Sequence, residues 1–450
     1  MCCRDSRRPA WLAVVALITA AAMPPLFAQS GADEHSQHQH GGDAPEAGVP
    51  QHDMSHMAQG GSESTAADRE GSGTSWLPDQ TPMFALHHQR NGWTFMTHFN
   101  AFLEYLHESG PRGSDQTGSI NWVMGMADHA LGGGRVRLRG MVSFEPWTIG
   151  GCGYPNVLAT GELCDGEAIH DRQHPHDLVM ELAATYDRPL ARGVHLQLYG
   201  GPVGEPALGP VAFMHRVSAM PNPLAPITHH WFDSTHIAYG VATGGLYSQR
   251  WKAEASVFNG REPDDHRTDF DFGPMDSWSG RLWFVPTRQW AFQASGGHLK
   301  DAEQNAVGEP RVSVDRVTAS ATYHRALHAS RIWANTFGWG RNLEHGHEAT
   351  NALLLESSLM LDDRDTAYAR VEWSEKSAHD LVVPGEQVLT VAKLQGGYTR
   401  SLGTWAGLTP GIGAAASAGI VPADLRSVYG SRVNAGFSVY LTVHPAAHGL

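Results

Sequence analysis

The chain has 450 residues, a formal net charge of -14 at pH 7, 50 glycines and only 17% charged residues. This acidic balance argues against nucleic acid as a partner. Frequent glycines and aromatic residues without long apolar stretches indicate strands and turns, and they exclude a bundle of membrane-spanning helices.

The first 28 residues have the pattern of a secretory signal peptide. Arg4, Arg7 and Arg8 precede an apolar segment from Trp11 to Met23, and Leu26-Phe27-Ala28 offers a cleavage site. The apolar segment is short for a spanning helix. We therefore expect export, with residues 1–28 removed.

Residues 29–88 are predicted to form a disordered periplasmic tail, because they bury too little apolar surface to offset the ordering entropy. Two short segments of this tail, HSQHQH and HDMSHM, are rich in histidine, and the second also carries methionine. Imidazole binds copper, zinc and nickel, whereas thioether sulfur selects Cu(I). The tail is thus either a polar spacer or a copper-capturing segment, whose ligands are His52, Met54, His56 and Met57.

From residue 89 to 450 the pattern has period two. Val136 and Leu138 share one face of a segment whose other face carries Arg135, Arg137 and Arg139. Such stretches number about sixteen, with an uncertainty of two. The predicted strands are 93–105, 119–128, 135–146, 177–187, 193–201, 236–247, 251–260, 277–286, 290–298, 315–325, 331–340, 351–361, 366–375, 387–399, 406–418 and 431–443.

The links between these strands alternate in length. Short links such as SQ, PTRQ, DDRD and SLGT alternate with longer ones. Outer-membrane barrels have short periplasmic turns and longer extracellular loops, whereas a soluble all-β protein has no reason for this regularity. We therefore predict an all-β, transmembrane antiparallel barrel in lipid of a Gram-negative outer membrane, with the N-terminal tail in the periplasm; a soluble all-β protein is the alternative.

The polar faces of these strands are predicted to line the lumen. Their mixed charges suit a water-filled or partly plugged barrel, and some of them serve only as cross-strand ion pairs. The lumen residues singled out are His98, Arg135, Arg137, Arg139, Glu145, Glu181, His195, Glu254, Arg281 and Glu372.

Two external loops are unusual. Cys152 and Cys164 form an even pair in an exported chain, which predicts a disulfide, and HDRQHPHD follows them from His170. The link between the fifth and sixth strands contains the apolar, Pro-rich sequence GPVGEPALGPVAFMHR. Because apolar side chains are costly to leave in water, this loop is expected to fold into the barrel mouth and narrow or plug it.

Histidines and methionines gather in these two loops. A copper or zinc site at the mouth is one interpretation, and structural packing of the plug is the other, since no pair has the tight spacing of a zinc motif. The candidate ligands are His170, His174, His176, Asp177, Met214, His215, Met220, His229, His230 and His236.

Two further functions, lipid hydrolysis and calcium binding, have weaker support in the sequence. An outer-membrane lipid hydrolase could pair Ser234 with His236 or Ser218 with His215, but there is no G-x-S-x-G, so we do not expect an enzyme. An acidic stretch after residue 261 offers oxygen ligands for calcium without EF-hand spacing. The acidic residues to test are Asp264, Asp265, Asp269 and Asp271.

An exported chain with the tail sequence HDMSHM followed by a barrel resembles the outer-membrane copper-resistance protein B family. The resemblance covers the architecture and the tail, and it implies copper as the ion and a role in keeping copper out of the cell; zinc and calcium come second. General porins are the other comparison; they share the strand number and imply a homo-oligomer. The predicted function is an outer-membrane barrel that binds or passes transition-metal ions; the alternatives are a general or substrate-specific porin for small solutes without a metal role, and the hydrolase.

Overall fold

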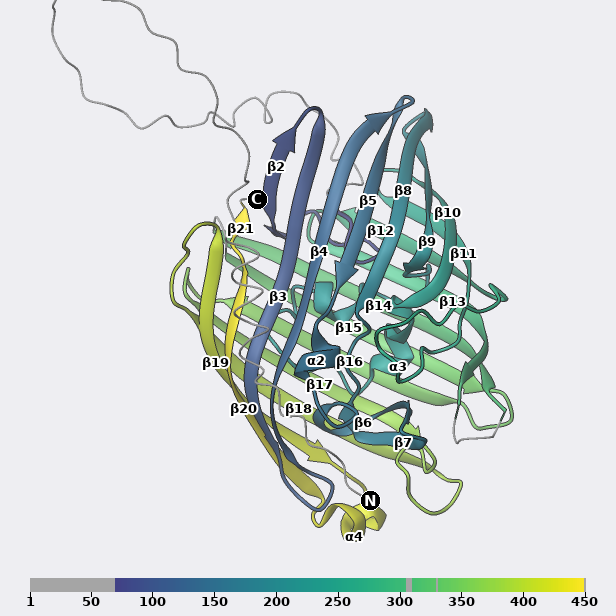
Figure 1. The fold of residues 1–450 in the computed structure, drawn as a ribbon, viewed down its shortest axis with the longest axis vertical. Helices are drawn as coiled ribbons and strands as arrows, with labels where there is room; N and C mark the ends of the chain where they lie inside the picture. The colour runs from purple at the N-terminus through teal and green to yellow at the C-terminus, as the bar shows by residue number, and fades with distance from the viewer. Residues whose placement is uncertain (1–68, 305–309, 329–330, 449–450) are drawn as a thin grey trace, which may run out of the picture.

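A computed structural model describes residues 69–304, 310–328 and 331–448. Its main feature is one antiparallel sheet of sixteen strands closed into a barrel (Figure 1). The wall strands are β3 (Trp93–Glu108), β4 (Asp115–Leu131), β5 (Gly134–Val142), β8 (Val179–Ala191), β9 (Val194–Gly204), β10 (Ala238–Tyr247), β11 (Trp251–Phe258), β12 (Ser277–Thr287), β13 (Trp290–Glu303), β14 (Val312–His328), β15 (Arg331–Glu344), β16 (Thr350–Met360), β17 (Asp365–Ser377), β18 (Val388–Ser401), β19 (Leu408–Ile420) and β20 (Val433–Pro445). All sixteen predicted strands are confirmed.

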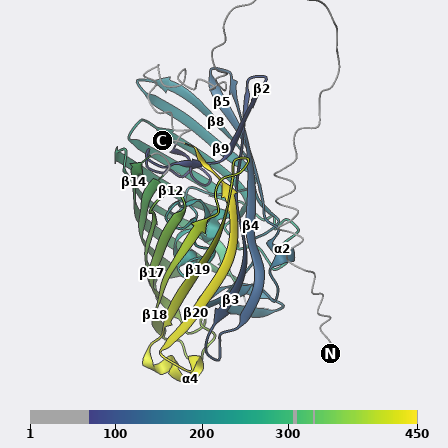
Figure 2. The same cartoon turned by 90° about the vertical axis from the view of Figure 1, so that its left-hand side faces the viewer.

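The barrel closes where its last strand pairs with its first. β20 lies along β3, from the pair Gly436 and Glu108 to the pair Val443 and Ala101 (Figure 2). β2 (Leu86–Arg90) continues beside the rest of β3, next to the end of β20. A two-stranded sheet of β1 (Met83–Phe84) and β21 (Ala447–His448) joins the start of the described chain to its C-terminal end.

The barrel exterior is apolar and its interior is polar, as strand β12 illustrates. Trp278, Leu282 and Phe284 are 58%, 61% and 52% exposed, whereas Ser279 and Arg281 on the alternate face are buried. This is the reverse of a water-soluble protein, and it is the pattern of a wall with lipid outside. The period-two prediction of strands with one apolar and one polar side, closed into a barrel, is therefore confirmed.

The two ends of the barrel differ. The short-turn end carries links such as 132–133 and 192–193; Gly132 and Gly133 both have positive φ, as a two-residue hairpin turn with the twist of the strands requires. The long-loop end carries residues 143–178, 205–237 and 259–276 and also η5 (Ala423–Leu425) and α4 (Arg426–Tyr429), at the bottom of Figure 1. Within the described ranges, no helix is long and apolar enough to cross a membrane.

Residues 69–88, which we expected to belong to the disordered tail, are ordered. Trp76 is fully buried in a cluster with Tyr247 and Trp283. The carboxylate of Glu70 forms ion pairs with Arg137 and with Arg139, the latter at 2.7 Å. Apolar burial and paired charge together offset the ordering entropy of this segment. The predicted signal peptide and the proposed tail ligands His52, Met54, His56 and Met57 lie outside the described residues.

Candidate functional site

Residues 205–237, which we call the plug loop, lie inside the barrel. The segment contains η3 (Phe213–His215), α3 (His229–Phe232) and η4 (Ser234–His236), and nearly all of it is buried. Its backbone bonds to strands on several sides of the lumen: Gly209 O accepts from Arg281 on β12, Leu224 O from Arg370 on β17, and Met220 O from Asn100 on β3. A loop tied to three separated parts of the wall obstructs the lumen.

Buried ion pairs hold the plug loop. The guanidinium of Arg216 donates to Glu356 of β16 at 2.8 Å and to Asp233 at 2.9 Å, and all three side chains are at most 2% exposed. Arg370 donates to the second oxygen of Glu356 at 2.9 Å. Because these groups have lost their hydration, their mutual pairing is what makes their burial tolerable.

Five imidazoles lie one beside the next, from the external loop that contains His174 into the plug loop, and we call them the imidazole row. They are those of His174, His230, His229, His236 and His176. Ring centroids lie 6.4 Å apart for His174 and His230, 5.7 Å for His230 and His229, 5.1 Å for His229 and His236, and 5.4 Å for His236 and His176. The structure thus brings together five of the predicted mouth ligands. Among the described residues, His176, His229 and His236 do not form a group whose ligand atoms all lie within 4.8 Å of one another.

The hydrogen bonds of this row tie its members to the fold. His229 Nδ1 donates to Asp233 at 2.9 Å, His176 Nδ1 to Glu145 at 2.9 Å, and His236 Nδ1 to the carbonyl of Asp233 at 2.7 Å. Burial lowers the pKa of His236 to about 3, with His229 adding to the effect. Although burial alone would raise the pKa of Asp233, Arg216 and His229 lower it well below its usual range. Neutral imidazoles around one carboxylate therefore stabilise the plug.

Two other predicted mouth ligands lie apart from the row. His170 contacts Asp171 at 2.9 Å and Arg112 at 3.2 Å, and Asp177 lies 3.8 Å from Arg267. Both belong to ion-pair networks of the loops. Of the segment HDRQHPHD, His174 and His176 therefore belong to the imidazole row, whereas His170 and Asp177 belong to the ion-pair networks of the loops.

Methionines and two histidines line a cavity of about 90 Å³ on the short-turn side of the plug loop, which we call the methionine cavity. It lies between the plug loop, β3, β4 and the ordered N-terminal segment. Its sulfur and imidazole residues are Met83, Met96, Met124, Met126, Met220, His98 and His215. Of the predicted mouth ligands, His215 and Met220 are therefore in this cavity and not in the imidazole row, and Met214 is buried beside them in the same packing cluster as Met124.

The histidines of the methionine cavity have a defined arrangement. His98 Nδ1 donates to the carbonyl of Phe84, which leaves Nε2 as the nitrogen with a lone pair. Metal-binding histidines commonly donate their other ring nitrogen to a carbonyl in this way. The Trp122 ring lies 4.7 Å from the ring of His98 and 4.8 Å from that of His215. Burial holds the pKa of His215 well below its usual range, so the ring is neutral and able to bind metal.

Sequence reasoning named only part of this cavity. Met124 and Met126 are two residues apart on β4, so period two places them on the same face of the strand. That they share a face could be recognised from the amino-acid sequence alone. Met83 has no such signal, because it lies in a segment that was expected to be disordered. Which methionines share a cavity depends on the plug loop and the N-terminal segment meeting inside the barrel.

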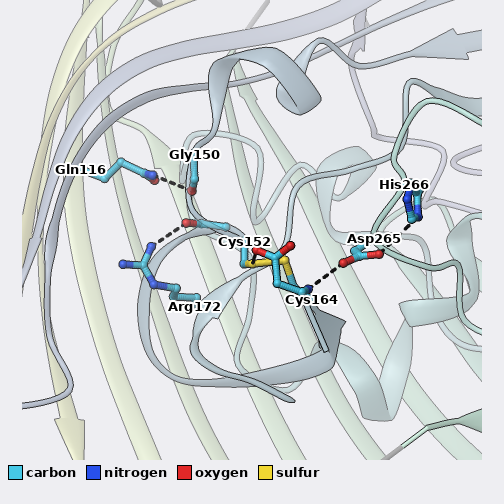
Figure 3. Close-up of a disulfide and its surroundings, with 9 residues drawn as sticks. Gln116, Gly150, Cys152, Cys164, Arg172, Asp265 and His266 are labelled. Carbon is cyan, nitrogen blue, oxygen red and sulfur yellow. Dashed lines mark hydrogen bonds and ion pairs between the residues drawn. A yellow bond between two sulfur atoms is a disulfide. The ribbon is translucent and has the colours of Figure 1, made fainter. Parts of the chain in front are cut away.

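Cys152 and Cys164 form the predicted disulfide (Figure 3). It closes the loop that contains β6 (Tyr154–Cys164). β6 pairs with β7 (Glu167–Gln173) in a hairpin that follows α2 (Glu145–Thr148) and lies at the long-loop end (Figure 1). Arg172 donates to Gly153 O at 2.8 Å, and the neighbouring acidic loop accepts from the hairpin through Asp265, whose carboxylate bonds the Asp165 amide at 2.7 Å. These hydrogen bonds therefore hold the hairpin against the neighbouring loop at the mouth of the barrel.

The acidic residues considered as calcium ligands do not all lie in one group. Ligand atoms of Asp264, Asp269 and Asp271 lie within 4.8 Å of one another, with two of the three side chains exposed. Asp265 belongs to a second such group, with Asp264 and His266, and also accepts from the Asp165 amide of the hairpin. Acidic groups on an exposed loop are common without an ion, so calcium stays a prediction without further support.

The serines considered for hydrolysis have other partners. Ser218 Oγ lies 2.8 Å from Thr336 Oγ1 and 3.4 Å from Glu356, and Ser234 Oγ accepts from Arg316 at 3.0 Å. Neither expected Ser–His hydrogen bond is among those of the described residues. The geometry therefore offers no activated serine at these positions.

Nine of the ten predicted lumen residues lie on wall strands, whereas Glu145, predicted on a strand over 135–146, lies on α2 because β5 ends at Val142. Seven of them are buried, and several form ion pairs: Arg139 with Glu70, Arg281 with Glu254 at 2.8 Å, and Arg137 with Asp128 at 2.8 Å. Arg135 is 27% exposed and lies 3.5 Å from Asp187. The buried seven are Arg137, Arg139, Glu145, Glu181, Glu254, Arg281 and Glu372.

A closed sixteen-stranded sheet with an apolar exterior and a charged interior defines a transmembrane β-barrel of the outer-membrane class. No family model and no curated protein matches the chain in sequence, so membership of the copper-resistance family stays a prediction.

Similar solved structures include three porins. Salmonella typhi OmpF in complex with daunomycin has a TM-score of 0.47 and 10% identity, covering 79% of this chain and 100% of that one. Pseudomonas putida OprB has the same TM-score and identity, with 79% and 94% covered. The anion-selective porin from Comamonas acidovorans has a TM-score of 0.46 and 9% identity, with 80% and 100% covered. These are similarities of chain path; the class assignment rests on the closed sheet and its apolar exterior.

Proposed function

We propose that this outer-membrane barrel binds copper in its lumen and passes it across the membrane when the plug loop moves. The observation that carries the proposal is the methionine cavity. Thioether sulfur and neutral imidazole are the ligands that Cu(I) prefers, and general porins need neither in a lumen that conducts hydrated solutes. Five methionines and two histidines around one cavity supply such a donor set.

The orientation follows from the loop lengths. Outer-membrane barrels place short turns in the periplasm and long loops outside, so the methionine cavity faces the periplasmic half. The described chain begins at residue 69, and its N-terminal segment lines this cavity through Met83 and Phe84. We propose that His52, Met54, His56 and Met57, which lie outside the described residues, deliver ions to the cavity.

The proposal is tested by anaerobic Cu(I) titration of the purified full chain in detergent against a chromogenic Cu(I) chelator. To remove the contribution of the tail, all variants carry alanine at the tail histidines and methionines of residues 29–68. Replacing Met124 and Met126 by leucine preserves volume and removes two thioethers. We expect at least a tenfold loss of Cu(I) affinity, about 1.4 kcal/mol.

The matched control is Met141→Leu with Met180→Leu. Both methionines are buried in the same packing cluster as Met124 but do not line the methionine cavity. These substitutions should leave Cu(I) affinity unchanged. Binding no tighter than about micromolar in the parent protein, roughly -8 kcal/mol, or equal losses in the two pairs, would remove the copper proposal. Conductance that is indifferent to copper and to deletion of residues 29–68 would instead support the general porin.

A further inference from the structure

A second cavity lies at the long-loop end, on the other side of the plug loop from the methionine cavity. It has a volume of about 40 Å³, enough for one ion with little water. Its charged and imidazole lining residues are His230, Glu262, Glu303, Glu344, His379 and Asp380. They come from α3, from the loop after β11, from the ends of β13 and β15, and from the loop after β17.

Three of these side chains already lie at ligand distances. His230 Nδ1 is 3.1 Å from Glu262 Oε1, and one ligand atom each of His230, Glu262 and Glu303 lies within 4.8 Å of the others. The side chains of His230 and Glu262 are 12% and 14% exposed. Two carboxylates at this separation repel each other unless a cation or a proton lies between them.

The surrounding structure holds these ligands in place. The amide of Glu262 donates to Ala302 O at 3.0 Å, which places Glu262 beside Glu303. The side chain of Asn342 donates to His230 O at 3.0 Å and in turn accepts from Arg316 at 2.9 Å. Such supporting bonds orient ligands for a metal.

The imidazole of His174, which follows β7, lies beside His230 but is not among the residues that line the cavity. A methyl group added at Gly161 of β6 would lie 3.3 Å from His174 Nδ1 and 3.4 Å from His230 Nε2, so the glycine leaves room for both rings. The His174 and His230 rings are 6.4 Å apart and nearly perpendicular. The donor set at this end is therefore imidazole and carboxylate, with no sulfur among the lining residues.

We propose that His230, Glu262 and Glu303 bind one divalent transition-metal ion, Zn(II) or Cu(II), at the long-loop end. One neutral imidazole and two carboxylates offset the charge of a divalent ion, and nitrogen and oxygen donors suit Zn(II) and Cu(II), whereas thioethers suit Cu(I). The two cavities thus select different ions. This site does not depend on the methionine cavity, so either proposal can fail without the other.

The experiment is isothermal titration of the full chain in detergent with ZnCl₂ and, separately, CuCl₂, in the background without tail histidines and methionines. The test variant is Glu262→Gln with Glu303→Gln. The control is Glu348→Gln with Asp424→Asn, which removes the same charge from exposed positions of the long-loop end that do not line this cavity. We expect the test pair to weaken Zn(II) binding at least tenfold and the control pair to leave it unchanged.

A measurement on the parent protein keeps the test independent of how the variants fold. X-ray absorption at the zinc edge should show nitrogen and oxygen neighbours that include at least one imidazole, and no sulfur. Sulfur neighbours, absence of bound zinc, or equal weakening in the test and control pairs would overturn the assignment. Cu(I) affinity of the Glu262→Gln, Glu303→Gln variant should match that of its parent, which separates this site from the methionine cavity.

Discussion

At the scale of single residues, the plug loop depends on a few fully buried charges. Arg216 satisfies two carboxylates and also donates to Val211 O at 2.9 Å, so one guanidinium joins two parts of the plug loop to the wall strand β16. Planar guanidinium groups suit such divided pairing better than ammonium groups do. Removing this cation would leave Glu356 with Arg370 alone and Asp233 with His229.

We expect Arg216→Met to lower the free energy of unfolding by about 3–5 kcal/mol, because a buried pair that loses one partner leaves an uncompensated charge. Urea unfolding in detergent, followed by tryptophan fluorescence, measures the change. Arg400→Met is the control: Arg400 pairs with Asp365 at 3.0 Å, but its side chain is 51% exposed, so it should cost less than about 1 kcal/mol. Similar losses in both variants would contradict the anchoring role.

At the scale of elements, we expect the docking of the plug loop to depend on pH. Burial lowers the pKa values of His215, His229 and His236, while Asp233 partly offsets this for His229. A released loop in water would have histidines with pKa values near about 6.5. Because the released state then binds protons that the buried state excludes, the docked plug is most stable above that pH and loses stability as the pH falls below it.

We therefore expect the docking free energy of the plug loop to weaken as the pH falls from 6.5 to 5, by up to about 1.4 kcal/mol per pH unit for each histidine. Protease cleavage within the plug loop, which measures the fraction released, should increase accordingly. The same protein probed at pH 7 and pH 8 should show no difference. His236→Asn removes one titrating group and should flatten the dependence. A docking free energy that stays constant down to pH 5 would show that these histidines do not titrate on release.

At the scale of the whole molecule, sixteen strands enclose a space wide enough for an aqueous channel, and the interior segments fill it. The plug loop, the ordered N-terminal segment and the β6–β7 hairpin all bring side chains into that space. We therefore expect these segments to obstruct the lumen.

Replacing residues 207–235 by a short Gly-Ser linker should therefore raise the single-channel conductance in planar lipid bilayers several-fold over that of the parent. The control is a deletion of residues 384–386, which shortens an exposed loop and should leave conductance unchanged. A parent protein that already conducts as well as the variant would show that the plug loop does not obstruct the path.

Strand positions were predictable from the amino-acid sequence because period two is a local property. Trp278, Leu282 and Phe284 alternate with Ser279 and Arg281 whatever the distant parts of the chain do, and lipid outside the barrel requires that alternation. The disulfide was likewise predictable, because its two cysteines lie 12 residues apart in a chain whose N-terminal sequence predicts export.

The sites were decided by tertiary structure. Met83, Met124 and Met220 are far apart in sequence, and they share a cavity only because the barrel wraps around two inserted segments. Glu262 and Glu303 become neighbours of His230 for the same reason, and no spacing rule connects them. Residues 69–82 carry no periodic pattern, yet Trp76 and Glu70 are buried, because the lumen supplies aromatic and arginine partners that only a closed barrel brings together.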